Sequence, residues 1–364
     1  MNISRTLTLP LLLSSFLLIG AGCANPFQLG AKKKTVVLPP DGGVQVTRDL
    51  GGTWTNNLAV PSSKGVGSLN QANVQVITMD PQDTRTLYIG TRDAGMLYTL
   101  DKGENWLQPR DSALTSGSIS SVAVDPKNVC TLYAVKGVNL LKSTDCLRSV
   151  VMDQFVETRK NVNLGRVVID WYAPSTVWLG ETNGDVQKSL DGGKTWQRNI
   201  NTGGDNITDI LISNTDSRIV LIGTSTKGLW KTVDGGANWK QISKPMSKFK
   251  NGDDIRDFSQ DKTGKTIIAA TSFGLLRTVD LGETWEEIRL LTAPGQVDIQ
   301  TLTMDPMNTK AIRYVTGNAL QISENGGETW SSQAFPTSRR AVSMVIDPTD
   351  SKVLYVGVVA PVKK

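Results

Sequence analysis

Residues 189–196 read SLDGGKTW, and variants of this octapeptide recur along the 364-residue chain. The other copies are TRDLGGTW from Thr47, TLDKGENW from Thr99, TVDGGANW from Thr232, TVDLGETW from Thr278 and SENGGETW from Ser323, with a degenerate copy, STDCLRSV, from Ser143. Successive copies start 52, 44, 46, 43, 46 and 45 residues apart. A period of this length indicates repeated supersecondary units that bury a continuous core by stacking.

Each octapeptide has the composition of a tight turn followed by a large aromatic residue. Its Asp and Ser or Thr side chains can hydrogen-bond with turn amides, and glycine supplies backbone freedom. Tryptophan buries a large flat surface at the start of the next strand. We therefore expect structural roles, and not ligand binding, for Asp49, Asp101, Asp145, Asp191, Asp234, Asp280, Asn325, Trp54, Trp106, Trp196, Trp239, Trp285 and Trp330.

A second pattern, a strand, an Asp-Pro-type turn and another strand, precedes most octapeptides. Examples are VQVITMDPQDTRTLYIGT from Val74 and AVSMVIDPTDSKVLYVGV from Ala341. Alternating and short continuous apolar runs of this length predict β-strands, and no helical period competes with them. The chain is therefore predicted to be all-β.

The order of the two patterns predicts how the repeats close. The first octapeptide has no strand pair before it, and the last strand pair, residues 341–358, has no octapeptide after it. We expect residues 341–358 to form the two inner strands of a unit whose outer strands are residues 44–58. The prediction is a seven-bladed β-propeller of four-stranded antiparallel blades over residues 44–358, closed by its terminal strands and followed by a C-terminal tail, residues 359–364.

The octapeptide pattern, [ST]-x-D-x-G-x-[ST]-W, resembles the Asp-box, or BNR repeat, and the resemblance covers residues 44–358. Families with this repeat include sialidases, xyloglucanase-type glycosidases, sortilin receptors and photosystem II assembly factors. The resemblance implies that each box lies on the turn between the third and fourth strands of a blade.

The first 30 residues predict export. Arg5 precedes an apolar stretch from Leu7 to Leu18, and small residues lead to Cys23. This pattern is typical of a signal peptide, residues 1–22, and the stretch is shorter than the roughly 20 residues of a membrane-spanning helix. The small residues before Cys23 resemble a bacterial lipobox, although Gly20 stands where leucine is usual; a plain signal peptide is the alternative. The resemblance implies lipidation of Cys23 and a tether over residues 23–43, on an extracytoplasmic membrane surface such as the cell surface or the periplasmic face.

Cys130 and Cys146 fall on opposite sides of a strand–turn–strand unit, at positions that face each other. An exported protein can keep a disulfide, so we expect a bond between them that braces the degenerate box. Two partly buried free thiols are the alternative.

The composition excludes several functions. The chain has no histidine, so Ser-His-Asp catalysis and His-ligated zinc or haem are ruled out. No metal-ligand cluster, phosphate loop or nucleotide fingerprint occurs, so we expect no metal and no cofactor. The formal net charge of +5 is too small for its length to indicate a nucleic-acid partner.

In a blade of this order, the connections from each outer strand to the next inner strand surround the mouth of the central channel. Basic residues gather in three of these connections: Arg159 and Lys160; Lys244, Lys248 and Lys250; Arg339 and Arg340. One interpretation is an electropositive surface for a protein partner, and the other is ordinary solvated loop charge. Acidic neighbours such as Asp153, Glu157 and Asp253 reduce the net charge.

A glycosidase needs two carboxylates about 5–9.5 Å apart across the scissile bond. Asp205, Asp253, Asp254 and Asp298 precede inner strands and could approach the channel, but they form no known motif. The sialidase Arg-Ile-Pro motif is absent, and xyloglucanase-type enzymes place their cleft between two propellers.

We predict no catalytic residues and a non-catalytic lipoprotein that binds a protein partner, most similar in architecture to the photosystem II assembly factors. Leu-Tyr-x-Gly replaces the Gly-Trp-x-x-Gly usual in that family, so a photosynthetic role is not inferred. A carbohydrate-active propeller, catalytic or lectin-like with a glycan ligand, is the alternative.

Overall fold

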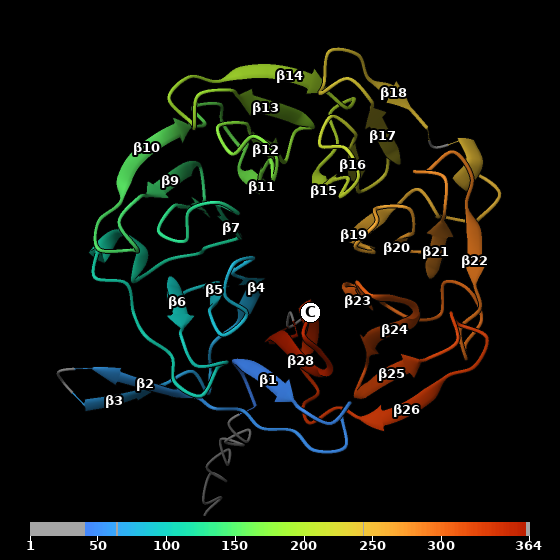
Figure 1. The fold of residues 1–364 in the computed structure, drawn as a ribbon, viewed down its shortest axis with the longest axis horizontal. Helices are drawn as coiled ribbons and strands as arrows, with labels where there is room; N and C mark the ends of the chain where they lie inside the picture. The colour runs from blue at the N-terminus through green and yellow to red at the C-terminus, as the bar shows by residue number, and fades with distance from the viewer. Residues whose placement is uncertain (1–40, 63–64, 243, 362–364) are drawn as a thin grey trace, which may run out of the picture. The chain divides into compact units, whose positions relative to one another are not determined.

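The computed structural model describes residues 41–62, 65–242 and 244–361. These residues form a ring of antiparallel blades, with the innermost strand of each blade toward the centre (Figure 1). The predicted seven-bladed propeller is confirmed. The predicted signal peptide and Cys23 lie outside the described residues. Within the described residues, no helix is long and apolar enough to cross a membrane.

Five blades have four strands each, in the order inner, second, third, outer. They are β7 (Ser121–Val124), β8 (Leu132–Lys136), β9 (Asn139–Ser143) and β10 (Val151–Val156); β11 (Leu164–Ile169), β12 (Val177–Glu181), β13 (Asp185–Ser189) and β14 (Gln197–Asn201); β15 (Ile207–Ile212), β16 (Val220–Thr224), β17 (Leu229–Thr232) and β18 (Lys240–Gln241); β19 (Ile255–Gln260), β20 (Ile267–Thr271), β21 (Leu275–Thr278) and β22 (Glu286–Ile288); and β23 (Leu302–Asp305), β24 (Asn308–Thr316), β25 (Ala319–Ser323) and β26 (Ser331–Ala334).

The other two blades have three regular strands, and their outer segment makes a single bridge. One consists of β4 (Val74–Met79), β5 (Leu87–Thr91) and β6 (Met96–Thr99), with Leu107 bridged to Tyr98. The closing blade joins β27 (Arg340–Asp347) and β28 (Asp350–Val359) to β1 (Val44–Thr47), with Thr55 bridged to Val46. Val44 pairs with Gly357, so the predicted closure by terminal strands is confirmed.

The connection from the closing blade to the next carries a hairpin that the sequence patterns do not predict. It consists of β2 (Ala59–Ser62) and β3 (Gly65–Ser68), which project from the ring (Figure 1). Two short 3-10 helices, η1 (Ser112–Leu114) and η2 (Lys244–Met246), lie in other connections. Residues 41–43 belong to the propeller, because the backbone N–H groups of Gly42 and Gly43 donate to Asn70 and Ala72.

The hydrophobic core lies between neighbouring blades. One cluster, for example, joins Trp178 and Val186 of one blade to Ile207, Ile210 and Ile222 of the next, all at most 4% exposed. Burial contributes about 25 cal/mol per Å² of apolar surface, so each blade is stabilised mainly by its neighbours. This explains why the innermost strands can keep polar side chains toward the channel.

The box turns use their polar side chains on their own backbone. In the box of β21 and β22, Thr278 Oγ1 donates to Asp280 Oδ1 (2.7 Å) and accepts from the N–H of Gly282 (2.9 Å). Asp280 Oδ1 also accepts from the N–H of Thr284 (2.8 Å), while Asp280 Oδ2 accepts from the Thr284 hydroxyl (2.6 Å). Gly282 has φ +88°, a conformation that side chains resist.

The same network recurs where the sequence varies. In the last box, Asn325 Oδ1 accepts from the Ser323 hydroxyl and from the N–H of Thr329. Hydrogen bonds from the following Thr195 hold the pKa of Asp191 at about 2, and bonds from Asn238 do the same for Asp234. These carboxylates are therefore ionised hydrogen-bond acceptors of the turn.

Most box tryptophans join their blade to the preceding one. Trp106 and Trp285 are buried, whereas Trp54, Trp196, Trp239 and Trp330 are half-buried. Trp196 Nε1 donates to the carbonyl oxygen of Gln154, and Trp330 Nε1 donates to that of Arg289. Both acceptors belong to the outer part of the preceding blade.

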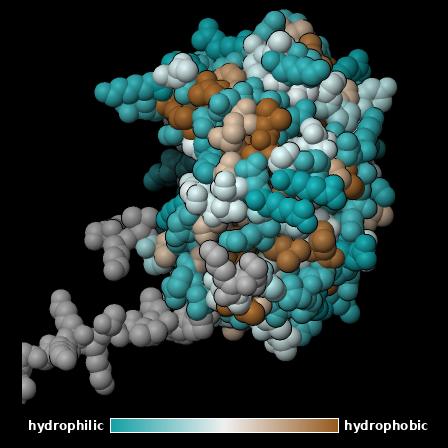
Figure 2. Space-filling view, turned by 90° about the vertical axis from the view of Figure 1, so that its left-hand side faces the viewer, coloured by the Kyte–Doolittle hydropathy of each residue, from teal (hydrophilic) through white to brown (hydrophobic). Residues whose placement is uncertain are grey.

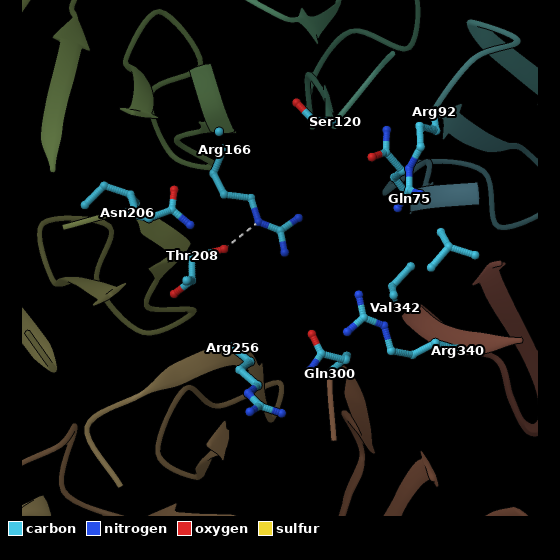
Figure 3. A pocket seen from close by; sticks show the side chains of 13 residues that line it. Gln75, Arg92, Ser120, Arg166, Asn206, Thr208, Arg256, Gln300, Arg340 and Val342 are labelled. Carbon is cyan, nitrogen blue, oxygen red and sulfur yellow. Dashed lines mark hydrogen bonds between the residues drawn. The ribbon is translucent and has the colours of Figure 1, made fainter. Parts of the chain in front are cut away.

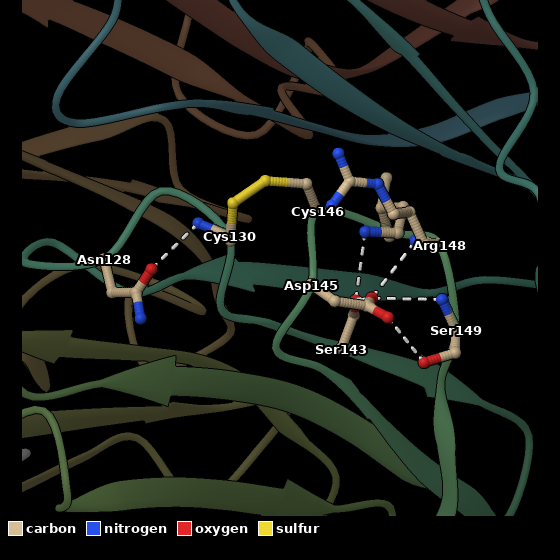
Figure 4. The surroundings of a disulfide bond; sticks show 8 residues. Asn128, Cys130, Ser143, Asp145, Cys146, Arg148 and Ser149 are labelled. Atoms are coloured by element: carbon tan, nitrogen blue, oxygen red, sulfur yellow. Dashed lines mark hydrogen bonds between the residues drawn. A yellow bond between two sulfur atoms is a disulfide. The ribbon is translucent and has the colours of Figure 1, made fainter.

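The degenerate box carries a disulfide between Cys130 and Cys146, whose Cα atoms lie 4.0 Å apart (Figure 4). The N–H of Cys146 also donates to the carbonyl oxygen of Cys130 (3.2 Å). In the next blade the corresponding bond runs from the N–H of Gly192 to Ser175 without a disulfide. Asp145 still accepts from Ser143 and Ser149, so this turn keeps its hydrogen bonds without its glycine and tryptophan. A disulfide is typical of compartments outside the reducing cytoplasm.

Candidate functional site

The channel mouth is lined by residues at one repeated position of the innermost strands. In five of these strands the pairing register shifts near the strand start, which leaves one residue bulged. A bulge redirects a side chain, and here it turns the side chain toward the mouth. The mouth-lining residues at the bulge or the equivalent position are Gln75, Ser120, Gly165, Thr208, Arg256, Gln300 and Val342.

Four arginines from different blades line the cavity at this mouth, which has a volume of about 410 Å³. They are Arg92, Arg166, Arg256 and Arg340. In Figure 3 the side chains of Arg166 and Arg340 point into the open space between the blades. Guanidinium groups present several donors in a planar fork that matches carboxylate geometry. The mouth therefore has the chemistry to bind anionic oxygen groups.

Nearby carboxylates balance part of this charge. Arg166 Nε donates to the carbonyl oxygen of Thr208 (2.8 Å) and lies 3.6 Å from Asp209 Oδ1. Arg256 pairs with Asp298, and Arg340 NH1 lies 3.6 Å from the other oxygen of the same carboxylate. Within the described part of the chain, no carboxylate lies within ion-pair distance of Arg92.

Two further cavities extend the mouth across neighbouring blades. One, about 550 Å³, is lined by Lys250, Arg256, Phe273 and residues 294–298. The other, about 310 Å³, is lined by residues 296–298, 315–317 and 338–341. Because these cavities share Arg256, Arg340 and residues 296–298 with each other or with the mouth, they form a groove that leads to the arginines. We name the mouth and these two cavities the mouth groove.

Another cavity, of about 500 Å³, lies away from the mouth and is lined by Lys188, Arg198 and the box residues 234–237. Figure 2 shows a mostly hydrophilic surface with separated apolar patches on the side that carries β10 and the β2–β3 hairpin. Val151, Met152 and Val156 are the exposed apolar residues of β10, at 54%, 43% and 41%. A few exposed apolar residues of this kind are ordinary on a protein surface.

The predicted basic residues are not equivalent in the structure. Lys250 lines the mouth groove, and Lys244 and Lys248 lie exposed on the same connection. Lys248 Nζ lies 4.9 Å from the centre of the Phe249 ring, and Phe249 packs on Phe273 with ring centres 5.0 Å apart. Arg340 lines the mouth itself, whereas Lys160 is exposed on another connection.

Arg339 does not belong to an exposed basic surface. Its side chain is only 8% exposed, and its Nε donates to Asp41 Oδ1 (2.9 Å). Asp41 Oδ2 accepts from the Thr337 hydroxyl (2.8 Å). Burial alone would raise the pKa of Asp41, but the hydrogen bonds from Thr337 and Arg339 lower it below its ordinary value. Arg339 therefore ties the start of the propeller to its closing blade, and it is unavailable to a partner.

Three carboxylate side chains surround Arg159. Its guanidinium pairs with Glu157, Glu181 and Asp185, all of which are buried. Hydrogen bonding to Arg159 lowers the pKa of Glu157 to about 2, whereas burial and the charge of Glu157 raise the pKa of Glu181 to about 7. The carboxylates outnumber the single cation, so this cluster does not extend the basic surface.

Two channel carboxylates that the sequence patterns do not single out join adjacent blades. Asp209 Oδ2 accepts from the N–H of Phe258 (3.0 Å), and Asp257 Oδ2 accepts from the N–H of Leu302 (3.1 Å) and the hydroxyl of Thr301 (2.8 Å). Burial and the charge of Asp209 raise the pKa of Asp257 to about 7. Asp209 and Asp257 occupy corresponding positions of two inner strands, and no distinctive sequence motif surrounds either of them.

Most of the carboxylates considered for glycoside hydrolysis form hydrogen bonds or ion pairs within the protein. Asp205 Oδ2 accepts from the N–H groups of Thr226 and Lys227, and Asp254 accepts from the Ser272 hydroxyl. Asp298 pairs with Arg256, and Asp253 is half-buried beside Asp254. Among the described residues, no group of three or more acidic or cysteine side chains has the arrangement of a metal site.

No protein-family model matches the chain. A probable oligoxyloglucan-reducing end-specific xyloglucanase of Neosartorya fischeri is 27% identical over 210 residues, which are 50% of this chain and 25% of that protein. The chain thus spans about a quarter of the length of this curated relative.

Two solved structures show the same fold. The GH74 enzyme of Niastella koreensis is 18% identical, with a TM-score of 0.64 over 79% of this chain and 51% of that chain. YCF48 bound to D1 peptide is 16% identical, with a TM-score of 0.59 over 79% of this chain and 94% of that one. The chain is therefore an Asp-box-type seven-bladed propeller. Its fold is that of GH74 xyloglucanases and of YCF48.

Proposed function

We propose that this protein is a non-catalytic scaffold that binds a protein partner through the mouth groove. The observation that carries the proposal is the set of four arginines, each from a different blade, that line one open mouth. Lys250 lines the groove together with Phe273 and extends this charge along it. Charges at a rim speed association and suppress wrong partners more than they add affinity.

The engagement of the channel carboxylates supports a non-catalytic role. A glycosidase acid and base must contact the substrate, but Asp209 and Asp257 bond to the backbone of the next blade. The similar fold of YCF48, whose structure contains a D1 peptide, supports a protein as the partner class. The proposed partner of this chain presents acidic groups.

A capture experiment tests the docking surface. The triple variant Arg92→Glu, Lys250→Glu, Arg340→Glu should lose at least about tenfold of the partner captured from the membrane fraction at low salt. The matched control is Lys194→Glu, Lys265→Glu, Lys352→Glu, which reverses three exposed charges near the box turns. Equal capture by both variants would contradict the docking surface.

A carbohydrate-active propeller is the second candidate, supported by the sequence similarity to a xyloglucanase. The wild-type protein should show neither hydrolysis of xyloglucan oligosaccharides nor binding on a glycan array. Hydrolysis that Asp257→Asn abolishes, or a glycan ligand that the triple variant still binds, would favour this second function.

The proposal includes export and a diacylated Cys23, which would hold the propeller at an extracytoplasmic membrane. Two acyl chains give stable anchoring, because each buried methylene contributes about 0.8 kcal/mol. A Cys23→Ser variant should leave the membrane fraction. A mature wild-type chain whose mass contains no lipid would contradict the anchor.

A further inference from the structure

Asp298 lies four residues before β23, the innermost strand of its blade, and its side chain lines the mouth groove. Its Oδ1 accepts from Arg256 and from Gln300 Nε2 (2.6 Å). Its Oδ2 lies 3.6 Å from Arg340 NH1. One carboxylate therefore bridges guanidinium groups from two different blades.

Among the described residues, no backbone N–H donates to the Asp298 carboxylate. The residue at the equivalent position of another blade differs, because Asn73 Oδ1 accepts from the backbone N–H of Ala360. Every hydrogen bond and ion pair of the Asp298 carboxylate runs instead to a side chain that lines the mouth. Its side chain is 54% exposed, so it is accessible from the groove.

Asp298 lies between two residues that pack in the core, Val297 and Ile299. Residues 291–296 are exposed, whereas Ile299 is completely buried. The Asp298 side chain can thus leave the two arginines while Ile299 keeps the strand in place. A displaced Asp298 would be solvated, and the hydrophobic core would be unchanged.

We propose that Asp298 is an internal competitor that occupies the Arg256–Arg340 pair until a carboxylate of the partner displaces it. The proposal rests on the proposed function of the mouth groove and specifies its ligand as a carboxylate-bearing segment. The geometry gives this class, because one carboxylate already accepts from Arg256 and lies 3.6 Å from Arg340 NH1. A charge-assisted bond of this kind is directional, so the incoming group should adopt the same bridging position.

Removing the competitor should strengthen binding. Asp298→Asn keeps the shape and an acceptor oxygen but removes the one negative charge that faces both arginines; Asp254 Oδ2 still lies 3.7 Å from Arg256. Exposed ion pairs of this kind are weak, so the affinity for an acidic peptide should rise about 3- to 10-fold. A change in general charge alone would give a smaller effect that does not depend on position.

The test is fluorescence anisotropy with a labelled ten-residue polyglutamate peptide that has a free C-terminal carboxylate, at low salt. Asp93→Asn is the matched control, because it removes one exposed negative charge from a nearby turn that follows Arg92. Thermal melts of both variants should match the wild type. Tighter binding by Asp298→Asn, with Asp93→Asn near the wild type, would support the proposal.

Three results would overturn it. They are unchanged or weaker binding by Asp298→Asn, an equal gain in both variants, and a failure of Asp298→Asn to bind the peptide at all. These outcomes are separate from the proposed function, which depends on partner capture by the wild type and its loss in the triple arginine and lysine variant. If the wild type captures a partner but Asp298→Asn binds the peptide no more tightly, the scaffold function stands and the competitor role of Asp298 is wrong.

Discussion

Asp280 and Asp298 are aspartates on opposite faces of neighbouring blades, and they use their oxygens differently. Asp280 accepts from a turn amide and from two hydroxyl groups of its own octapeptide. Asp298 contacts only side chains around the channel mouth. The comparison teaches that the acceptor's partners, and not the residue type, separate a polar group that builds the fold from one that faces a ligand. We expect changes on the box face to alter stability and changes at the mouth to alter binding.

The largest effect on stability is expected at the disulfide of the box face. Replacing Cys130 and Cys146 by serine should lower the free energy of unfolding by about 3 kcal/mol, the value for a closed loop of this length in the chain-entropy model. Urea unfolding of the oxidised wild type and the double variant measures the difference. Equal midpoints, or free thiols in a non-reduced digest of the wild type, would contradict it.

A smaller loss is expected when an intact box loses one acceptor. Thr278→Val keeps the side-chain shape but leaves the buried N–H of Gly282 without its hydroxyl partner, at a cost of about 2 kcal/mol. Thr292→Val, at an exposed position of the following mouth connection, should stay within about 0.5 kcal/mol of the wild type. Equal losses from both variants would break the distinction between the faces.

Asp257 lies between the two faces and gives a pH-dependent test. Its pKa is raised from 3.8 to about 7, so the stability it contributes is complete below pH 3.8 and is lost as the pH rises through 7. Asp257→Asn imitates the protonated form and can keep the bonds to Leu302 and Thr301. It should stabilise the protein by about 1–2 kcal/mol above pH 7, a value reduced for its half-buried position, and should have little effect below pH 4. Melting curves across this range would show no convergence at low pH if the pKa were ordinary.

The smallest stability effect is expected at the mouth. Arg92→Gln with Arg340→Gln removes two charges whose side chains are exposed or half-exposed, and the free energy of unfolding should change by less than about 0.5 kcal/mol. Binding of an acidic peptide should nevertheless fall at low salt, and the difference should shrink as salt rises. A strongly destabilised variant would show that these arginines also build the fold.

The fold was predictable because its signals are local and repeated. The octapeptides mark the turns, and the unpaired strand patterns at residues 44–58 and 341–358 predict the closing blade. Parts of the site depend on details that no octapeptide carries. Arg339 and Arg340 are adjacent in sequence, yet one is buried against Asp41 and the other lines the mouth. Successive side chains along an extended chain point to opposite sides, so a run of basic residues does not predict a uniform surface.

Arg256 shows why the mouth itself was missed. It lies at a bulge, where the register shift between Ile255 and Asp257 turns its side chain to the channel end. The alternation of apolar residues in IRDFSQ predicts a strand but not this extra residue. A comparison of the residue after the first apolar position in all seven inner strands would have gathered Gln75, Arg256 and Gln300 as one set.

The pairing of β1 with β28 also has a consequence for how the protein folds. Val44 is among the first propeller residues to leave the ribosome, while its partner Gly357 is among the last. β1 therefore waits unpaired while the intervening blades form, and ring closure requires a contact of very large sequence separation. Such contacts slow folding and leave a strand edge open to intermolecular pairing. Closure of the last blade is thus expected to be the late, concentration-sensitive step in refolding.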